Sequence, residues 1–176
     1  APRIASQAVE KVKAPTTKPG LYDLVLDPEH LSLTMHESCG HPSELDRALG
    51  YEANYAGTSF LTTAKRGTYR YGSPHVNLVA DNTEPETLAA TGYDDDGVAC
   101  QRWDIVRDGI FVGYCTNREV APKIGETRSR GSNRADSWGS VPIVRIANIG
   151  LEPGTATLDN LLADVKRGIY IEGHGS

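Results

Sequence analysis

Residues 36–46 read HESCGHPSELD, and this stretch determines how the rest of the chain is interpreted. A signal for the start of a helix precedes this stretch in the sequence. Asp27 is suited to cap a helix, Pro28 is tolerated at a first helical position, and Glu29 complements the helix dipole. We therefore expect a helix that begins near residue 28 and leads into the first histidine of the stretch.

The spacing of His36 and His41 predicts a disturbance of that helix. At about 100° per residue, a five-residue step would turn the two imidazole rings about 140° apart on a regular α-helix. Gly40 accepts unusual backbone angles, and Pro42 biases the residue before it away from the helical conformation. We expect the helix to end near Gly40 or to widen into a π-bulge, and either change can bring the two rings together.

The residue types in this stretch suit zinc chemistry. In the His-Glu-x-x-His motif of zinc peptidases, two imidazoles bind the metal and the glutamate is the general base. We therefore expect His36 and His41 to bind zinc and Glu37 to activate a water molecule. Glu44 and Asp46 are the two alternatives for a carboxylate that orients an imidazole through its far nitrogen. A match this short also occurs by chance, so support has to come from the rest of the chain.

Composition and charge limit the other functions. The chain has 176 residues, enough for one domain with a buried core, and a net charge of −5, which argues against a nucleic-acid partner. No stretch approaches the roughly 18 apolar residues that cross a bilayer, and we expect a cytoplasmic protein with no membrane contact. The cysteines are three and widely spaced, without a CxxC pair, so neither a disulfide framework nor a closed cysteine zinc site is expected.

The remaining pattern predicts an α+β fold, with a mixed or antiparallel β-sheet body and a few helices. Helices are expected over residues 2–13, 28–37 and 158–167, and strands over 21–26, 75–80, 98–106, 110–114, 141–151 (interrupted by Pro142) and 169–171. The Asp108-Gly109 pair between two apolar runs predicts a β-hairpin. The polar stretches 50–74 and 125–140 are expected to be mobile loops with a binding role.

The order of these motifs resembles the TldD/PmbA family of metallopeptidases over nearly the entire chain. The features that carry the resemblance are the histidine motif with Gly40, Glu44 and Asp46, the acidic turn 94–97 leading to Gln101, Asp108-Gly109, Gly113-Tyr114, the loop 130–134, Pro142, Arg145 with Asn148, and Gly168-Ile169-Tyr170. The resemblance implies that residues 1–176 are a single segment from the central to C-terminal part of such a peptidase, truncated at both ends.

The resemblance also bears on the metal. It implies a subunit of the catalytic type, because the related partner subunit of the family lacks the histidine–glutamate motif. It implies a cysteine as third zinc ligand, in a segment beyond residue 176. The weaker alternatives inside the chain are Cys39, Cys100, Cys115, His30, His75 and His174.

Two functions of different classes follow. The first is a zinc-dependent peptidase that hydrolyses flexible or unfolded peptides, as a homodimer or a heterodimer with a related subunit. Arg134, Arg145 and Asn148 are then the expected substrate contacts, although a structural ion pair for Arg145 and a strand-end hydrogen bond for Asn148 are equally good readings. The second is a non-catalytic peptide-binding subunit or regulatory module of a TldD/PmbA-type complex. The missing third ligand keeps the second open, whereas Glu37 argues against it because binding alone needs no general base.

Overall fold

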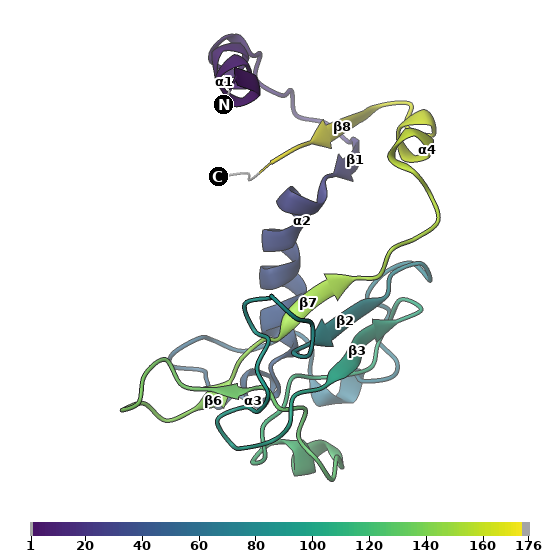
Figure 1. The fold of residues 1–176 in the computed structure, drawn as a ribbon. Coiled ribbons are helices and arrows are strands. Elements are labelled where there is room, and N and C mark those ends of the chain that lie inside the picture. The colour runs from purple at the N-terminus through teal and green to yellow at the C-terminus, as the bar shows by residue number, and fades with distance from the viewer. Residues whose placement is uncertain (1, 174–176) are drawn as a thin grey trace.

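The computed structural model of the protein describes residues 2–173 and has the predicted α+β architecture (Figure 1). The α-helices are α1 (Pro2–Lys13), α2 (Pro28–Met35), α3 (Leu45–Ala48) and α4 (Leu158–Ala163), and shorter helical turns are η1 (His36–Gly40), η2 (His41–Ser43), η3 (Thr63–Lys65) and η4 (Ala121–Ile124). The strands are β1 (Asp23–Leu26), β2 (Leu78–Asp81), β3 (Arg102–Arg107), β4 (Ile110–Phe111), β5 (Asn133–Arg134), β6 (Ile143–Val144), β7 (Asn148–Leu151) and β8 (Gly168–Ile171). Antiparallel pairs predominate, so the mixed sheet body with a few helices is confirmed.

The central sheet has the strand order β4-β3-β2-β7, and each neighbouring pair in it is antiparallel. Leu78 and Ala80 of β2 are buried together with Val79, which lies on the other face, so both faces of this strand are covered. The core continues to Phe111 and Tyr114, whose rings meet edge to face with centroids 4.8 Å apart. This packed sheet is the support on which the end of α2 rests (Figure 1).

The turn between β3 and β4 is the predicted hairpin. Asp108 and Gly109 have φ angles of 50° and 75°, the positive values that a type I′ turn requires at both central positions. A side chain at Gly109 would also collide with the backbone, because a Cβ there would lie 2.4 Å from the Ser73 carbonyl oxygen. The two strands are shorter than predicted, since residues 98–101 and 112–114 lie outside them.

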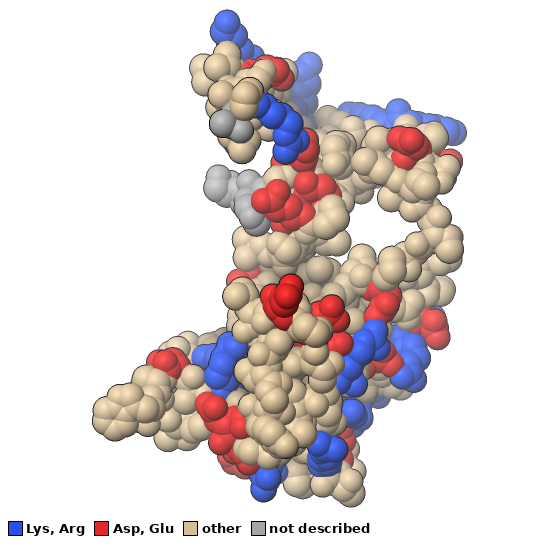
Figure 2. All heavy atoms as spheres, in the orientation of Figure 1, with Lys and Arg blue, Asp and Glu red and all other residues tan. Residues whose placement is uncertain are grey.

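A second unit consists of α1, β1, α4 and β8. β1 and β8 pair in parallel, with Asp23 opposite Gly168 and Leu26 opposite Ile171. The sequence predicts both strands, over residues 21–26 and 169–171, but not their pairing. Figure 1 places this unit away from the central sheet, joined to it by α2 and by the segment between β7 and α4. Figure 2 shows an opening between these two connections and, below it, acidic and basic side chains interspersed over the body. Within residues 2–173, no helix is both long and apolar enough to cross a membrane.

The prediction of one strand over residues 141–151 is wrong. The region forms two strands, of which β6 pairs with β5 and β7 joins β2. The backbone N–H of Arg145 donates to the Ser132 carbonyl at 2.8 Å, which extends the pairing of β6 with β5, and the chain pairs with β2 only from Asn148 onward. β5 lies inside the predicted loop 125–140, α3 has no counterpart among the predicted helices, and α4 ends at Ala163 rather than at residue 167.

Candidate metal centre

The helix that leads to the candidate metal centre begins as its sequence predicts. The Asp27 side chain caps α2 by accepting a hydrogen bond from the backbone N–H of His30 at 2.7 Å. Pro28 is the first residue of the helix, where its missing N–H costs nothing. The last turn of the helix, and His36 directly after it, lie at the edge of the central sheet.

The predicted π-bulge is confirmed. Residues His36–Gly40 form a π-turn in which the backbone N–H of His41 donates to the carbonyl of His36, five residues earlier. A 3₁₀ turn follows over His41–Ser43, with Pro42 at its start. The local reason differs from the one expected, because Gly40 (φ −65°) and His41 (φ −57°) both keep right-handed helical angles. Gly40 is needed for space instead: a Cβ there would lie 3.2 Å from two side-chain carbons of Ile146.

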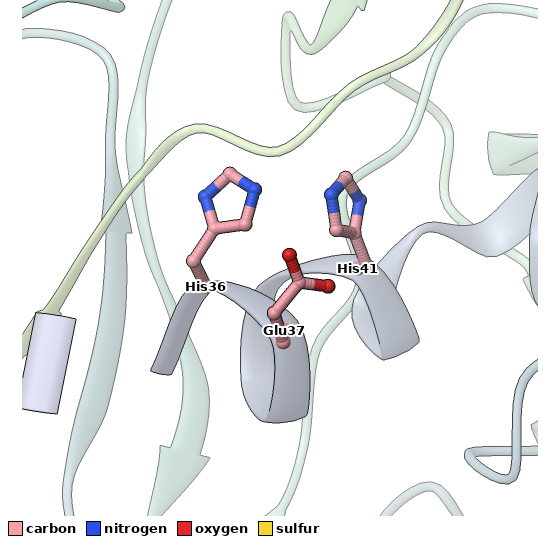
Figure 3. Close-up of side chains that lie close together, drawn as sticks. All are labelled: His36, Glu37 and His41. Atoms are coloured by element: carbon pink, nitrogen blue, oxygen red, sulfur yellow. The ribbon is translucent and has the colours of Figure 1, made fainter. Parts of the chain in front are cut away.

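The wider turn brings His36 and His41 onto the same side of the chain. Their ring centroids are 4.6 Å apart and the ring planes are perpendicular. The potential ligand atoms of His36, Glu37 and His41 all lie within 4.8 Å of one another. Figure 3 shows both imidazoles rising from the same side of the ribbon, with the Glu37 carboxylate between them. His36 and Glu37 are exposed and His41 is half-buried, so the cluster is open to a ligand on one side.

The Glu44 carboxylate orients the imidazole of His41. Its Oε1 lies 3.1 Å from Nδ1 of His41, and its side chain is fully buried. Arg47 binds the same carboxylate through Nε at 2.9 Å and Nη2 at 2.8 Å, and Nη1 of Arg145 lies 3.9 Å from it. Arg47 Nη2 is also 3.3 Å from His41 Nδ1, but the carboxylate is nearer. An Nδ1–H bonded to Glu44 leaves Nε2 of His41 as the free lone pair.

Asp46 has a different role from the one expected of it. Its two carboxylate oxygens accept the backbone N–H groups of Arg47 (2.7 Å) and Val144 (3.0 Å) rather than an imidazole. Burial raises the pKa of this carboxyl to about 6. Asp46 therefore ties β6 to α3, and so to the turn that carries His41.

The other cysteines and histidines lie elsewhere. Cys39 and Cys115 are buried, and burial raises the pKa of both thiols, that of Cys115 to about 11, so they stay protonated and are poor metal ligands. Among residues 2–173, the cluster of His36, Glu37 and His41 includes no cysteine and neither His30 nor His75. His174 lies outside the described residues.

The three predicted substrate residues line two hollows, and the first of these also includes His36 of the cluster. The first, of about 390 Å³, is lined by His36, Arg134 and Asn148 among others, and the second, of about 350 Å³, by Arg134, Arg145 and Tyr55 among others. A third hollow, the largest of these three at about 490 Å³, includes no member of the cluster, and the metal chemistry is not assigned to it.

The side chains of the three predicted substrate residues differ in the hydrogen bonds and ion pairs that they make within the chain. The Asn148 amide donates to the Asp81 carbonyl (2.8 Å) and accepts from the backbone N–H of Ala89 (3.2 Å), so it holds a loop on the sheet. The Arg145 guanidinium faces Glu44, in agreement with the structural ion pair considered for it. Arg134 is exposed and faces both hollows. Arg47 is a site residue that the sequence argument missed, although its i, i+3 spacing from Glu44 on a short helix is a usable signal.

Comparison with known proteins identifies the family of the chain. Residues 19–175 match the family described as the PmbA/TldA metallopeptidase C-terminal domain. A metalloprotease of Synechocystis sp. is 32% identical over 168 residues, which are 96% of this chain and 35% of the relative. A zinc metalloprotease TldD homolog of Saccharolobus solfataricus is 28% identical over 170 residues, which are 96% of this chain and 36% of the relative.

Solved structures share the fold. TldE from Thermococcus kodakarensis matches with a TM-score of 0.69 at 22% identity, over 96% of this chain and 37% of that chain. A Thermotoga maritima protein whose description refers to a modulator of a DNA gyrase matches with a TM-score of 0.73 at 22% identity, over 96% of this chain and 36% of that chain.

These matches first define the class of protein: a metallopeptidase-type domain with an α+β fold. The chain belongs to the PmbA/TldD family of metallopeptidases, as its motifs predict. It spans about a third of the length of the curated relatives, 35% of the Synechocystis protein and 36% of the Saccharolobus protein.

Proposed function

We propose that the chain carries the metal-binding part of a zinc-dependent peptidase that hydrolyses flexible or unfolded peptides. The observation that carries the proposal is the convergence of His36, Glu37 and His41, whose ligand atoms lie within 4.8 Å of one another. Two relatives are named metalloproteases, one of them a zinc metalloprotease. Residues 1–176 are then the central to C-terminal segment of a longer cytoplasmic enzyme.

The donor set fits zinc. Neutral imidazole nitrogens bind zinc at about 2.0–2.1 Å, so two of them on one ion are at most about 4.2 Å apart. The ligand atoms of His36, Glu37 and His41 lie within 4.8 Å of one another, and His36 is exposed, so its ring is free to turn toward an ion. The third protein ligand in this proposal is the cysteine that the family resemblance implies, outside the described residues.

A bound zinc ion would polarise a peptide carbonyl and lower the pKa of a water molecule. The residues of this chain would do the rest. Glu37 lies between the imidazoles and would accept the proton of the attacking water, then pass it to the leaving amine (Figure 3). Glu44 would keep His41 in the tautomer with a proton on Nδ1, and Arg47 would keep the buried Glu44 charge compensated.

The substrate would bind as an added strand. β7 is an edge strand of the central sheet, with β2 on one side and no strand paired to its other side among the described residues. Ile149 of β7 packs near Gly40, and residues 146–149 line the hollow that His36 also lines. An extended, unfolded peptide could therefore pair with the free edge of β7 and pass its carbonyl groups beside the metal ligands. A homodimer or a heterodimer with a related subunit would complete the enzyme.

The alternative is a non-catalytic peptide-binding subunit. It stays open because His36 and His41 supply two protein ligands, and a catalytic zinc has three. Glu37 argues against it, since a carboxylate placed between the two imidazoles serves no need of simple binding.

Metal content and hydrolysis of the full-length parent protein test the proposal. Wild-type protein should hold about one zinc per active site, and His36→Ala or His41→Ala should abolish binding. Glu37→Gln should retain the zinc and lose peptide hydrolysis by several powers of ten. His75→Ala, which removes an exposed histidine outside the cluster, is the matched control. Full zinc occupancy in the double-Ala variant, or parental hydrolysis by the Glu37 variant, would contradict the assignment.

A further inference from the structure

The hollow beside His36 has an unusual lining. Its other residues are Ser32, Leu88, Ala89, Arg134, Ile146, Ala147, Asn148 and Ile149. Most of them are apolar, and Arg134 is the one side chain in this set with a permanent charge. Arg134 also lines two further hollows, so it stands where all three meet. The space next to the candidate metal ligands is therefore an apolar volume with a single cation at its border.

This cation is not engaged within the chain. Among the described residues, the Arg134 guanidinium makes no recorded ion pair or hydrogen bond, although the side chain is exposed on the surface of these hollows. Several other arginines of the body are paired with carboxylates: Arg47, Arg66, Arg102, Arg107 and Arg130. Arg70, Arg118 and Arg128 resemble Arg134 in having no carboxylate partner among the described residues, but they do not line the hollow beside His36. The five N–H donors of Arg134 are thus available to a ligand.

The backbone that carries Arg134 is held on both sides. The Asp94 carboxylate accepts the backbone N–H of Asn133 at 3.2 Å, and the Asp95 carboxylate accepts that of Ala135 at 2.7 Å. Across the small sheet Arg134 lies opposite Ile143 of β6, the strand that Asp46 ties to α3. The backbone position of Arg134 relative to His41 is therefore fixed by hydrogen bonds, so a ligand would have to order only the Arg134 side chain.

The surrounding charges favour an anion on one side only. Glu52 and Asp136 line the second hollow, where they would oppose a negative ligand, and Arg145 there faces Glu44. The hollow toward His36 has no acidic residue in its lining. A planar guanidinium binds a carboxylate through two parallel hydrogen bonds, and a peptide has carboxylates at its C-terminus and on Asp and Glu side chains.

We propose that Arg134 determines specificity by binding a substrate carboxylate, while an apolar substrate side chain occupies the hollow between Arg134 and His36. This inference rests on the proposed peptidase function and names the substrate class of that site. The preferred peptide has an apolar residue followed closely by a carboxylate, either the chain terminus or an acidic side chain.

Peptide binding to the full-length parent protein with Glu37→Gln tests this inference without turnover. Three fluorescein-labelled octapeptides with the same apolar residues are compared by anisotropy: one with a free C-terminal carboxylate, one with a C-terminal amide, and one amidated with an internal Asp. Arg134→Gln should weaken binding of a carboxylate peptide about tenfold and leave the plain amide within about twofold. Arg134→Lys keeps the positive charge but lacks the paired N–H donors of a guanidinium. Its affinity for a carboxylate peptide should therefore lie between the affinity of the protein with Arg134 intact and that of Arg134→Gln. Arg118→Gln, at an exposed arginine of the largest hollow, is the matched control and should change neither.

The three peptides separate the outcomes. Preference for the free terminus identifies a C-terminal carboxylate as the ligand, and preference for the internal Asp identifies an acidic side chain. Equal binding of all three peptides by the protein with Arg134 intact, or an equal loss for all three in Arg134→Gln, would overturn the inference while leaving the metallopeptidase proposal in place. Absence of binding for every peptide would contradict both.

Discussion

Replacing Asp46 with Asn should remove a pH dependence from the stability of this chain. Asp46 is 4% exposed, and burial raises its pKa from the ordinary 3.8 to about 6, although the N–H groups of Arg47 and Val144 oppose the shift. Between these two pKa values the folded chain keeps a proton that the unfolded chain has released. The free energy of unfolding therefore falls as the pH rises through this window, and the contribution is fully present only below about pH 4.

The size of the effect follows from the two pKa values. At about 1.36 kcal/mol per pH unit, the difference between 3.8 and about 6 amounts to about 3 kcal/mol. Urea unfolding followed by circular dichroism, from about pH 3 to 7.5, measures it in wild-type chain and Asp46→Asn. The stability difference, wild type minus variant, should fall by about 3 kcal/mol across this range. Asp46→Asn also loses one acceptor oxygen. This loss changes the stability difference by the same amount at every pH, so it does not affect the fall. Parallel pH profiles for the two proteins would refute the reasoning.

Further substitutions test the packing of the site and of the turn between β3 and β4. Glu44→Gln leaves two guanidinium groups facing a neutral amide and should cost about 3–5 kcal/mol of stability, measured by urea unfolding, with zinc affinity of the parent reduced about 10–100-fold. In Gly40→Ala the new Cβ should contact the Ile146 side chain and lower the free energy of unfolding by about 1–3 kcal/mol in the same assay. An unchanged stability would show that the turn can accommodate a Cβ at this position. Gly109→Ala should cost more than Gly125→Ala, because both have positive φ but only the first would strike backbone; equal costs would count against the steric account.

Several features of the fold could be predicted because they depend on neighbours in the sequence. Asp27 and Pro28 start α2, and the Asp108-Gly109 pair forms the hairpin between β3 and β4. The five-residue spacing of the histidines predicted the π-turn, although the role assigned to Gly40 was wrong: the residue makes room for Ile146 and keeps helical angles. The cap, the hairpin turn and the π-turn each depend on backbone angles or hydrogen bonds within a few residues, whereas the contact of Gly40 with Ile146 is long-range and was not predicted.

Other features could not be predicted, since they depend on partners far away in the chain. The split of residues 141–151 arises because Val144 bonds to Asp46, 98 residues earlier, while residues 148–151 pair with β2. The choice between Glu44 and Asp46 as the partner of His41 has the same origin: both carboxylates lie on one short segment, and the backbone of β6 occupies Asp46.

The zinc-type residue set, the widened turn and the family relationship are thus determined by short stretches of sequence, because they depend on residue type and local spacing. The parallel pairing of β1 with β8 and the hollow beside His36, with Arg134 at its border, arise only in the folded chain. Asp23 and Gly168 become neighbours, and Arg134 comes to share a hollow with His36, through long-range packing and hydrogen bonds that no local pattern encodes.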